Sequence, residues 1–322
     1  MLTANHVYFQ YAPKKPILKN INFEIQSGEF IAILGESGSG KSTLLKLIYG
    51  LEDVEKGEIT FNNKQVTGPK FNLVPGHPEM KFVPQEFNLL EMLSAAENVG
   101  KYLSSFNLSK KQSTINRALR AVSMLSLKDK LTAELSGGER QRISIASALA
   151  ARPKVLLLDE PYGHLDQILK NEIRTGIREW ALENNCIVLL TTHDIQDVMG
   201  FSDRVFVIKN GRIIQKAVPE ELKSQPKNEY VAGLLGEYSV LDANTMKSFF
   251  KIQIEDGRKA IIYPEELEEN NSGTTFKIIN TRFQGRDYLV KAEKSGQMIL
   301  FYSAQKPEKD RIKLKIKNFR WV

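Results

Sequence analysis

The sequence is poor in cysteine, with one among 322 residues, and it contains no long apolar run. A single thiol cannot form an intrachain disulfide, which is typical of a protein from a reducing compartment. Cys186 lies in an apolar stretch, so we expect a buried, unreactive thiol. No segment has the roughly 18 apolar residues that cross a bilayer, and no signal segment is evident. We therefore expect a cytoplasmic protein that is not itself a channel.

The chain also lacks a strong excess of either charge. Its 45 Lys and Arg against 38 Asp and Glu give a net charge of +7. This balance fits an anionic membrane face, a nucleic acid or simply a well-solvated surface, and it does not decide among them. Hydrophobic residues make up 42% of the sequence, enough for a substantial core, and the length predicts one long domain or two.

The most informative segment follows the apolar stretch from Phe30 to Leu34 and has the pattern G-x-x-x-x-G-K-[ST] before a helical stretch. Glycine exposes backbone N–H groups to an oxyanion, and the helix that follows adds its positive end. Lys41 can reach the terminal phosphates, Ser42 can ligate Mg²⁺, and Thr43 continues the helix. The alternative is an ordinary turn before a helix. The predicted nucleotide-binding residues are Gly35, Glu36, Ser37, Gly38, Ser39, Gly40, Lys41, Ser42 and Thr43.

Apolar and polar residues alternate over residues 7–11 and 20–26, which predicts two antiparallel strands before this loop. Tyr11 ends the first of them. Its ring can stack on an adenine, or it can be an edge or core tyrosine, and the pattern leaves both open.

Residues 155–158 are uniformly apolar, as in a strand buried on both faces of a parallel sheet, and Asp159 and Glu160 follow at its tip. Asp159 is a candidate Mg²⁺ ligand, directly or through water. Glu160 is a candidate general base that polarises the attacking water. The alternative for both is a structural salt bridge.

Two further strand ends carry polar candidates. His193 follows the apolar strand 187–190 and can donate to the γ-phosphate or to the water, although a lone histidine is often structural. Gln85 ends the predicted strand 81–85, where its amide can meet a metal or a water.

Helical periodicity over residues 89–130 predicts a helical insert of about 89–135. The insert ends at Leu135, Ser136, Gly137, Gly138 and Glu139, and a strong helix former continues to Ala150. Ser136 and Glu139 match a capping box. The same residues also suit a second anion site, because a hydroxyl and bare glycine backbone precede a helix.

In their order along about 230 residues, the phosphate loop, Gln85, LSGGERQR, VLLLDEP and Thr-His-Asp resemble the nucleotide-binding subunit of an ATP-binding cassette (ABC) transporter. The LSGG run is the most specific of these motifs. The resemblance implies that Tyr11 stacks on adenine, that Gln85, Glu160 and His193 are the Q-loop, catalytic and switch residues, and that Asp166 is the D-loop aspartate. It also implies a head-to-tail dimer in which each LSGG segment caps ATP held by the partner's phosphate loop.

Two features depart from the family pattern. Gly163 stands where the family usually has Ser, so a contact across the dimer is expected to be weaker. The segment from Val66 to Gln85 is longer than is common, and the usual Arg before the Q-loop strand is not evident. Neither departure removes a catalytic group.

Asn210 and Gly211 predict a hairpin between strands at 204–208 and 212–215, and a helix is expected over 220–235. After residue 236 the composition changes to short strands, predicted at 249–254, 259–263, 276–280, 287–292, 298–302 and 311–316, with a turn at residues 256–257. This region resembles the TOBE-type, OB-like barrel of importer ATPases. The expected fold is thus an α/β P-loop NTPase over 1–235, with its helical insert, followed by a small all-β barrel over 236–322.

The resemblance implies an ATP-hydrolysing, Mg²⁺-dependent subunit that powers solute import, in the polyamine, iron, sulfate or sugar-type group. Its expected partners are a second copy or a similar ATPase, transmembrane permease subunits and an external solute-binding protein, without nucleic acid. We expect it on the inner face of the cell membrane. One alternative is an exporter or lipid-extraction ATPase, against which the C-terminal barrel argues. The other is a soluble ABC ATPase acting on ribosomes or DNA, against which the single cassette and the absence of sustained heptads argue.

Overall fold

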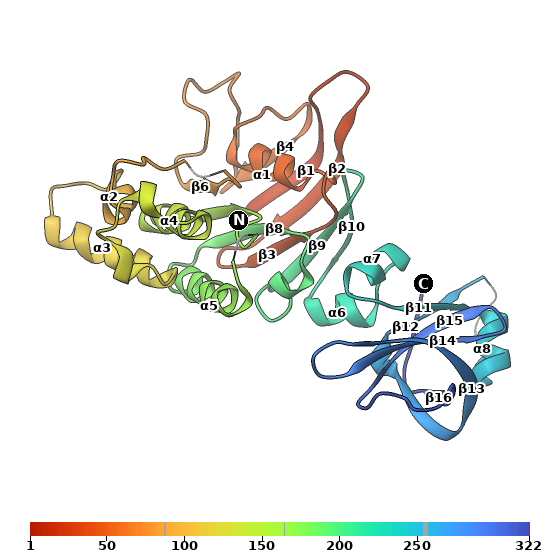
Figure 1. The fold of residues 1–322 in the computed structure, drawn as a ribbon. Helices are drawn as coiled ribbons and strands as arrows, with labels where there is room; N and C mark the ends of the chain where they lie inside the picture. The colour runs from red at the N-terminus through yellow and green to blue at the C-terminus, as the bar shows by residue number, and fades with distance from the viewer. Residues whose placement is uncertain (87, 164, 254–256) are drawn as a thin grey trace. The chain divides into compact units, whose positions relative to one another are not determined.

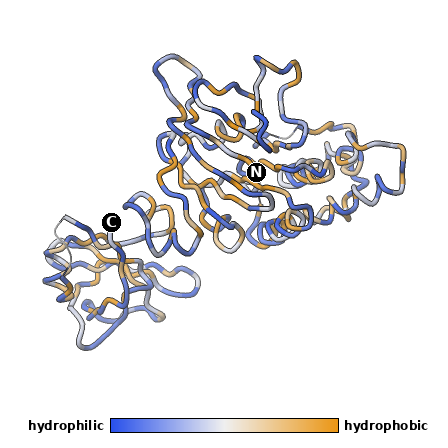
Figure 2. Tube along the Cα trace, turned by 180° about the vertical axis from the view of Figure 1, so that it is seen from behind, coloured by the Kyte–Doolittle hydropathy of each residue, from blue (hydrophilic) through white to orange (hydrophobic). Residues whose placement is uncertain are grey.

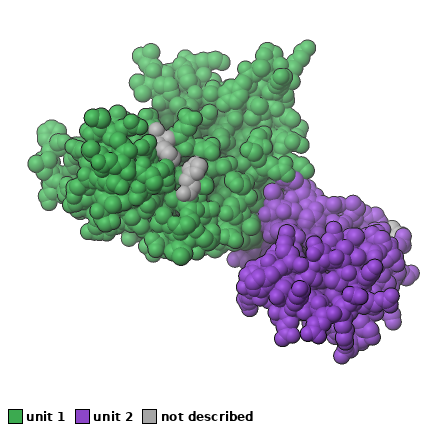
Figure 3. Space-filling model, viewed as in Figure 1, with its two compact units in different colours: residues 1–219 green, residues 220–322 purple. Residues whose placement is uncertain are grey.

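The computed structural model describes residues 1–86, 88–163, 165–253 and 257–322 (Figure 1). Hydrophobic residues, orange in Figure 2, run along the strands inside the molecule. The chain divides into two compact units, Met1–Pro219 and Glu220–Val322 (Figure 3), and each has its own core of buried apolar side chains. The boundary between the two compact units therefore follows Pro219, whereas the change of composition in the sequence predicts a boundary after residue 235.

The central sheet of unit 1 has six strands in the order β10-β9-β3-β8-β7-β6. Five of them run parallel and β10 pairs antiparallel with β9, which confirms the predicted hairpin. Every residue of β3, β7 and β8 is buried, as expected for strands covered on both faces. The strands are β3 Phe30–Leu34, β6 Met80–Val83, β7 Val155–Asp159, β8 Ile187–Thr192, β9 Arg204–Lys209 and β10 Arg212–Ala217.

A second, antiparallel sheet has the order β2-β1-β4-β5. The predicted pairing of the first two strands is confirmed. Helix α1, Lys41–Tyr49, shares one apolar core with both sheets, which fixes the loop before it against the central sheet. The strands are β1 Leu2–Gln10, β2 Pro16–Ile25, β4 Lys56–Phe61 and β5 Lys64–Gln65.

The helical insert is confirmed, but its first helix starts later than the periodicity suggested. Ser94 caps α2 through a capping box with Glu97, so residues 89–94 are not helical. The insert contains α2 Ala95–Gly100 and α3 Leu108–Ala121, with short 3-10 turns at Leu125–Leu127 and Thr132–Glu134. Beyond it, unit 1 has α4 Gly137–Ala150, α5 Gln167–Glu183 and a 3-10 turn at Ile195–Asp197. Among the residues described, no helix combines the length and the apolar character needed to span a bilayer.

Unit 2 corrects one helix prediction. The helix expected over 220–235 is two short helices, α6 Pro219–Ser224 and α7 Glu229–Leu234. Pro226 lies between them and cannot continue a helix, and the Asn228 side chain caps the second one.

The strand expected over 249–254 is also wrong. Residues Ala243–Phe250 form helix α8, whose first turn is capped by the Asp242 side chain, which accepts from Thr245 N at 2.7 Å. The helix buries Met246 and Phe249 and ends at Lys251, which has a left-handed φ of 58°. Residue 254 and the first residue of the predicted turn at 256–257 lie outside the described residues.

The remaining strands of unit 2 form antiparallel sheets in the orders β11-β12-β17 and β15-β14-β13-β16 around one apolar cluster, consistent with an OB-like barrel. A 3-10 turn, Pro264–Glu266, leads into the longest strand. The strands are β11 Ser239–Asp242, β12 Lys259–Ile262, β13 Leu267–Phe283, β14 Tyr288–Lys294, β15 Gln297–Ser303, β16 Arg311–Ile316 and β17 Arg320–Trp321.

Candidate active site

The glycine-rich loop joins β3 to α1 and leaves the start of the helix open. Gly40 is the N-cap of α1, with φ 106° and no side-chain cap. Gly38 also has a positive φ, of 76°, and a Cβ on Gly35 would lie 2.4 Å from the Ile208 carbonyl oxygen. Because the first N–H groups of a helix have no intrahelical partner, this loop can present them to an anion.

Two buried polar side chains belong to this loop. Lys41 donates to the carbonyl oxygens of Gly35 at 2.9 Å and Glu36 at 3.1 Å. Burial lowers the pKa of Lys41, and the negative charges of Glu160 and Asp159 oppose that shift. Ser39 is 7% exposed, and its hydroxyl has no hydrogen-bond partner among the described residues. The loop therefore keeps a cation and a spare hydroxyl next to the open helix end.

The Ser42 hydroxyl and the Asp159 carboxylate form a pair of hard oxygen donors. Asp159 is buried at the end of β7 and accepts from Ser42 Oγ at 2.9 Å. It also accepts from Thr191 Oγ1 at 2.6 Å. A hydroxyl and a carboxylate fit Mg²⁺, which takes few protein ligands together with phosphate oxygens. Thr43 lies in the first turn of α1, as expected.

Glu160 follows Asp159, and its carboxylate lies near the Lys41 ammonium group and the His193 imidazole ring. Oε1 lies 3.7 Å from Lys41 Nζ, and Oε2 lies 3.4 Å from His193 Nδ1. The imidazole is 67% exposed, so a second molecule can reach it from solvent. The structure thus brings together the predicted catalytic pair with the phosphate loop and Asp159.

The sequence analysis assigned no role to two residues that bind the backbone of Glu160. Thr191 Oγ1 accepts from Glu160 N at 3.0 Å, and Gln141 Nε2 donates to Glu160 O at 3.2 Å. One signal was available: Thr191 is a hydroxyl residue at the end of an otherwise apolar strand. Gln141 offered none, because it lies one turn inside a helix.

Three other candidates form no hydrogen bond or ion pair with this cluster in the part of the chain that the structure describes. Gln85 is exposed and lies two residues beyond β6. Tyr11 is 56% exposed, and its ring forms a T-shaped contact with Phe9, with centroids 4.7 Å apart. Asp166 caps α5, where it accepts from Leu169 N at 3.0 Å.

The LSGG segment forms the N-terminus of α4 and has the capping box that its sequence allowed. Ser136 Oγ accepts from Glu139 N at 3.3 Å, and Glu139 Oε2 accepts from Ser136 N at 2.8 Å. This backbone hydrogen bond from Ser136 lowers the pKa of Glu139. Leu135 is buried, whereas Gly137 is exposed and Gly138 is partly exposed. The helix end is therefore accessible but already capped by its own side chains.

Comparison with known proteins identifies related chains. Residues 18–163 match the family model described as ABC transporter. The chain is 30% identical to the spermidine/putrescine import ATP-binding protein PotA of Clostridium novyi, with 91% of this chain and 88% of the relative aligned. It is 35% identical to the Fe(3+) ions import ATP-binding protein FbpC of Fusobacterium nucleatum, but that match spans 73% of this chain and only 63% of the relative.

Solved structures agree. The protein cbiO1 from Clostridium perfringens, described as part of the ABC transporter complex cbiONQ, is 32% identical with a TM-score of 0.61, over 69% of this chain and 89% of that one. The ATP-binding cassette MJ0796, solved as a dimer in a post-hydrolysis state with ADP and Pi, is 29% identical with a TM-score of 0.59, over 68% and 99% of the two chains.

Proposed function

Because this chain belongs to the family of ABC transporter ATP-binding proteins, we propose that it binds and hydrolyses ATP. The observation that carries the proposal is the arrangement around Glu160. Its carboxylate lies 3.7 Å from Lys41 Nζ in the phosphate loop and 3.4 Å from His193 Nδ1. Asp159, which precedes Glu160, and Thr192, which precedes His193, are the last residues of neighbouring parallel strands, and open α/β sheets bind ligands at this edge.

The residues take complementary roles. The open N-terminus of α1 and Lys41 hold the phosphates, and the exposed Tyr11 ring receives the adenine. Ser42 and Asp159 would hold Mg²⁺, with Gln85 as the further ligand that the family resemblance implies, and the ion would neutralise charge on the phosphate oxygens. Glu160 accepts a proton from the attacking water, and His193 donates to charge that develops on the γ-phosphate.

Substituting Glu160→Gln tests this assignment. The amide keeps the shape of the side chain but cannot accept the proton, so hydrolysis should fall at least about a hundredfold while ATP still binds. Phosphate release and the Kd for Mg-ATP are the measurements. Glu58→Gln, at an exposed position of β4, is a matched control that should retain both. Near-normal turnover of the Glu160 variant would refute the proposal.

We propose a head-to-tail dimer as the active form. Residues 135–139 and residues 35–43 both suit phosphate, at the N-termini of α4 and α1. In the proposed dimer, each LSGG segment contacts the phosphate held by the other copy, with Asp166 near the shared boundary. The dimeric state of MJ0796 supports a dimer. Analytical ultracentrifugation should show Glu160→Gln dimers with Mg-ATP and monomers with ADP; monomers in both would contradict it.

We further propose that the dimer powers a solute importer through separate membrane-spanning permease subunits. The support is the set of importer relatives, whose printed names include iron, sulfate or thiosulfate, and spermidine or putrescine. The barrel proposed over residues 236–322 as a TOBE-like domain agrees with this group. In this proposal, the protein lies on the inner face of the membrane, works with an external solute-binding protein and binds no nucleic acid.

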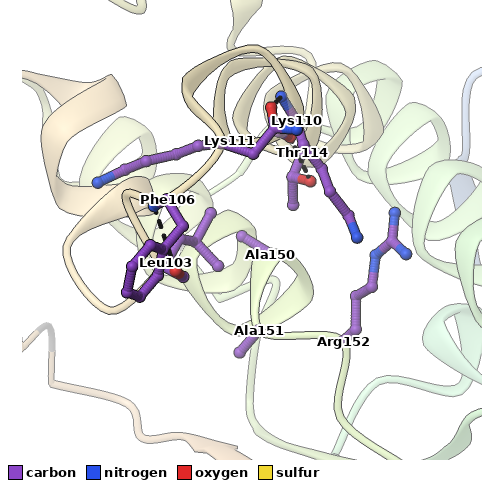
Figure 4. A pocket seen from close by; sticks show the side chains of 10 residues that line it. Leu103, Phe106, Lys110, Lys111, Thr114, Ala150, Ala151 and Arg152 are labelled. Atoms are coloured by element: carbon purple, nitrogen blue, oxygen red, sulfur yellow. Dashed lines mark hydrogen bonds between the residues drawn. The ribbon is translucent and has the colours of Figure 1, made fainter.

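The helical insert offers a surface for such a partner. A pocket of about 430 Å³ opens between the start of α3 and the end of α4. Figure 4 shows Leu103 and Phe106 on one side of it and Lys110 and Arg152 on another. The Phe106 side chain is fully exposed, so burying it against a partner would remove apolar surface from water.

Capture of tagged Glu160→Gln from native membranes with Mg-ATP, in mild detergent, tests the importer. A multi-spanning protein together with an external binding protein is the expected result. A membrane protein that moves its substrate outward would instead mean an exporter or lipid-extraction ATPase. Ribosomal or DNA-bound partners without a membrane protein would mean a soluble ABC ATPase.

A further inference from the structure

Glu160 has an unusual backbone conformation. Its φ is 45°, in the left-handed region that residues with a side chain rarely occupy. It also precedes Pro161, and a residue before proline normally adopts an extended conformation. Such a backbone persists only where surrounding contacts hold it.

Thr191 holds the peptide on the N-terminal side of Glu160. It is fully buried in β8, and its Oγ1 accepts from Glu160 N at 3.0 Å. The same hydroxyl donates to Asp159 Oδ1 at 2.6 Å. One side chain therefore fixes both the proposed metal ligand and the start of the peptide that turns the next carboxylate toward Lys41.

Gln141 holds the other side. It is 1% exposed, and its Nε2 donates to Glu160 O at 3.2 Å. Its own Oε1 is buried with no hydrogen-bond partner among the described residues. An unsatisfied buried amide oxygen destabilises the fold, and an apolar residue of similar size would avoid that cost. Stability alone therefore does not explain a glutamine here.

We propose that Thr191 and Gln141 are positioning residues that clamp the strained backbone of Glu160 and so aim its carboxylate. The inference rests on the proposed role of Glu160 as general base. Gln141 lies on α4, whose N-cap is Ser136, so the clamp also connects the helix of the LSGG segment to the Glu160 carboxylate. Because misplacing a catalytic group by about 1 Å can cost about a hundredfold in rate, releasing either side of the clamp should slow hydrolysis.

The test uses the full-length protein with Gln141→Leu and Thr191→Val, which remove the hydrogen bonds with little change of volume. We expect kcat to fall between about tenfold and about a hundredfold, with KM and the Kd for Mg-ATP changed by less than about twofold. Thr191→Ser, which restores the hydroxyl, should recover most of the rate. Gln112→Leu and Thr175→Val, on exposed faces of α3 and α5, are the matched controls.

A purely structural role would lower the melting temperature of both variants and leave kcat per folded molecule unchanged, which would overturn the proposal. Adding Gln141→Leu to Glu160→Gln should slow the residual hydrolysis by less than about twofold, because the clamp acts through that carboxylate; a full additional loss would contradict this. If excess Mg²⁺ restores Thr191→Val, that residue acts through Asp159 and its place in the clamp is rejected. If Glu160→Gln hydrolyses ATP normally, the proposed function itself fails, irrespective of the clamp.

Discussion

Two glycine-containing helix starts in unit 1 look alike in sequence and differ in structure. At α1 the N-cap is Gly40, which contributes no side-chain hydrogen bond. At α4 the N-cap is Ser136, and a reciprocal capping box with Glu139 occupies part of the helix end. The first can therefore receive a phosphate within one chain. The second already has an internal cap and a nearby carboxylate, so it is less suited to hold a phosphate by itself, and in the proposed dimer its exposed hydroxyl and Gly137 meet a phosphate that the partner holds.

The largest expected difference concerns nucleotide affinity. Lys41→Ala removes a buried cation from the phosphate loop and should raise the Kd for Mg-ATP about a hundredfold or more. Ser136→Ala should leave the Kd of the monomer within about twofold but reduce hydrolysis by about tenfold or more, because in the proposed dimer its hydroxyl contacts the nucleotide of the partner and not that of its own chain. Calorimetric titration and phosphate release measure the two.

Loss of the helix cap complicates Ser136→Ala, since it should also lower stability by about 1 kcal/mol. Ser136→Asp separates the effects: aspartate still caps the helix, but its charge repels phosphate. We expect this variant to melt near the wild-type temperature and still lose hydrolysis. Equal Mg-ATP affinities for the Lys41 and Ser136 variants would contradict the view that only the α1 loop binds the nucleotide within one chain.

Alanine substitutions at the two loops should change stability in opposite directions. A Cβ at position 35 would lie 2.4 Å from a backbone oxygen, so Gly35→Ala should distort the loop and lower both the melting temperature and ATP affinity. A Cβ at position 137 would meet nothing within 4 Å, so Gly137→Ala should stabilise α4 by roughly 0.5–1 kcal/mol. Equal melting temperatures for these two variants would contradict the comparison.

The smallest expected effect depends on pH. The hydrogen bond from Ser136 N lowers the pKa of Glu139 below its ordinary value of 4.5. Its folded pKa is thus below the unfolded one, so the stabilisation is present above about pH 4.5 and is lost as pH falls through the folded pKa. The difference in melting temperature between wild type and Glu139→Gln should therefore shrink from about pH 6 to about pH 3. A difference independent of pH would contradict the carboxylate cap.

The sequence was sufficient where a local signal matched a local structure. Strand β3, the phosphate loop and α1 form a contiguous segment whose glycines, lysine and apolar run each indicate the same structure. Unit 2 was less predictable. Apolar residues near Phe249 suggested a strand, but capping by Asp242 together with burial of Met246 and Phe249 favoured a helix. Pro226, between α6 and α7, is a local signal against one continuous helix. The helical patterns on either side of it nevertheless predicted one helix.

The site shows the same limit. Asp159 and Glu160 could be proposed as site residues because carboxylates at a strand tip are informative without knowledge of their neighbours. Thr191 and Gln141 could not, because their importance depends on the backbone conformation of Glu160 and on two elements distant from it in sequence. Their hydrogen bonds arise only when β8 and α4 pack against the end of β7. Residue type alone does not specify such contacts.

The buried thiol of Cys186 can report local opening of the structure around it. Burial raises the pKa of Cys186 to about 12, so almost none of it is thiolate near neutral pH, and its side chain is inaccessible beside β8. Alkylation of the native protein must therefore await a local opening that exposes this side chain. Since this is the only cysteine in the sequence, the labelling rate reports that opening, and a cysteine introduced on the surface could carry a probe without competition.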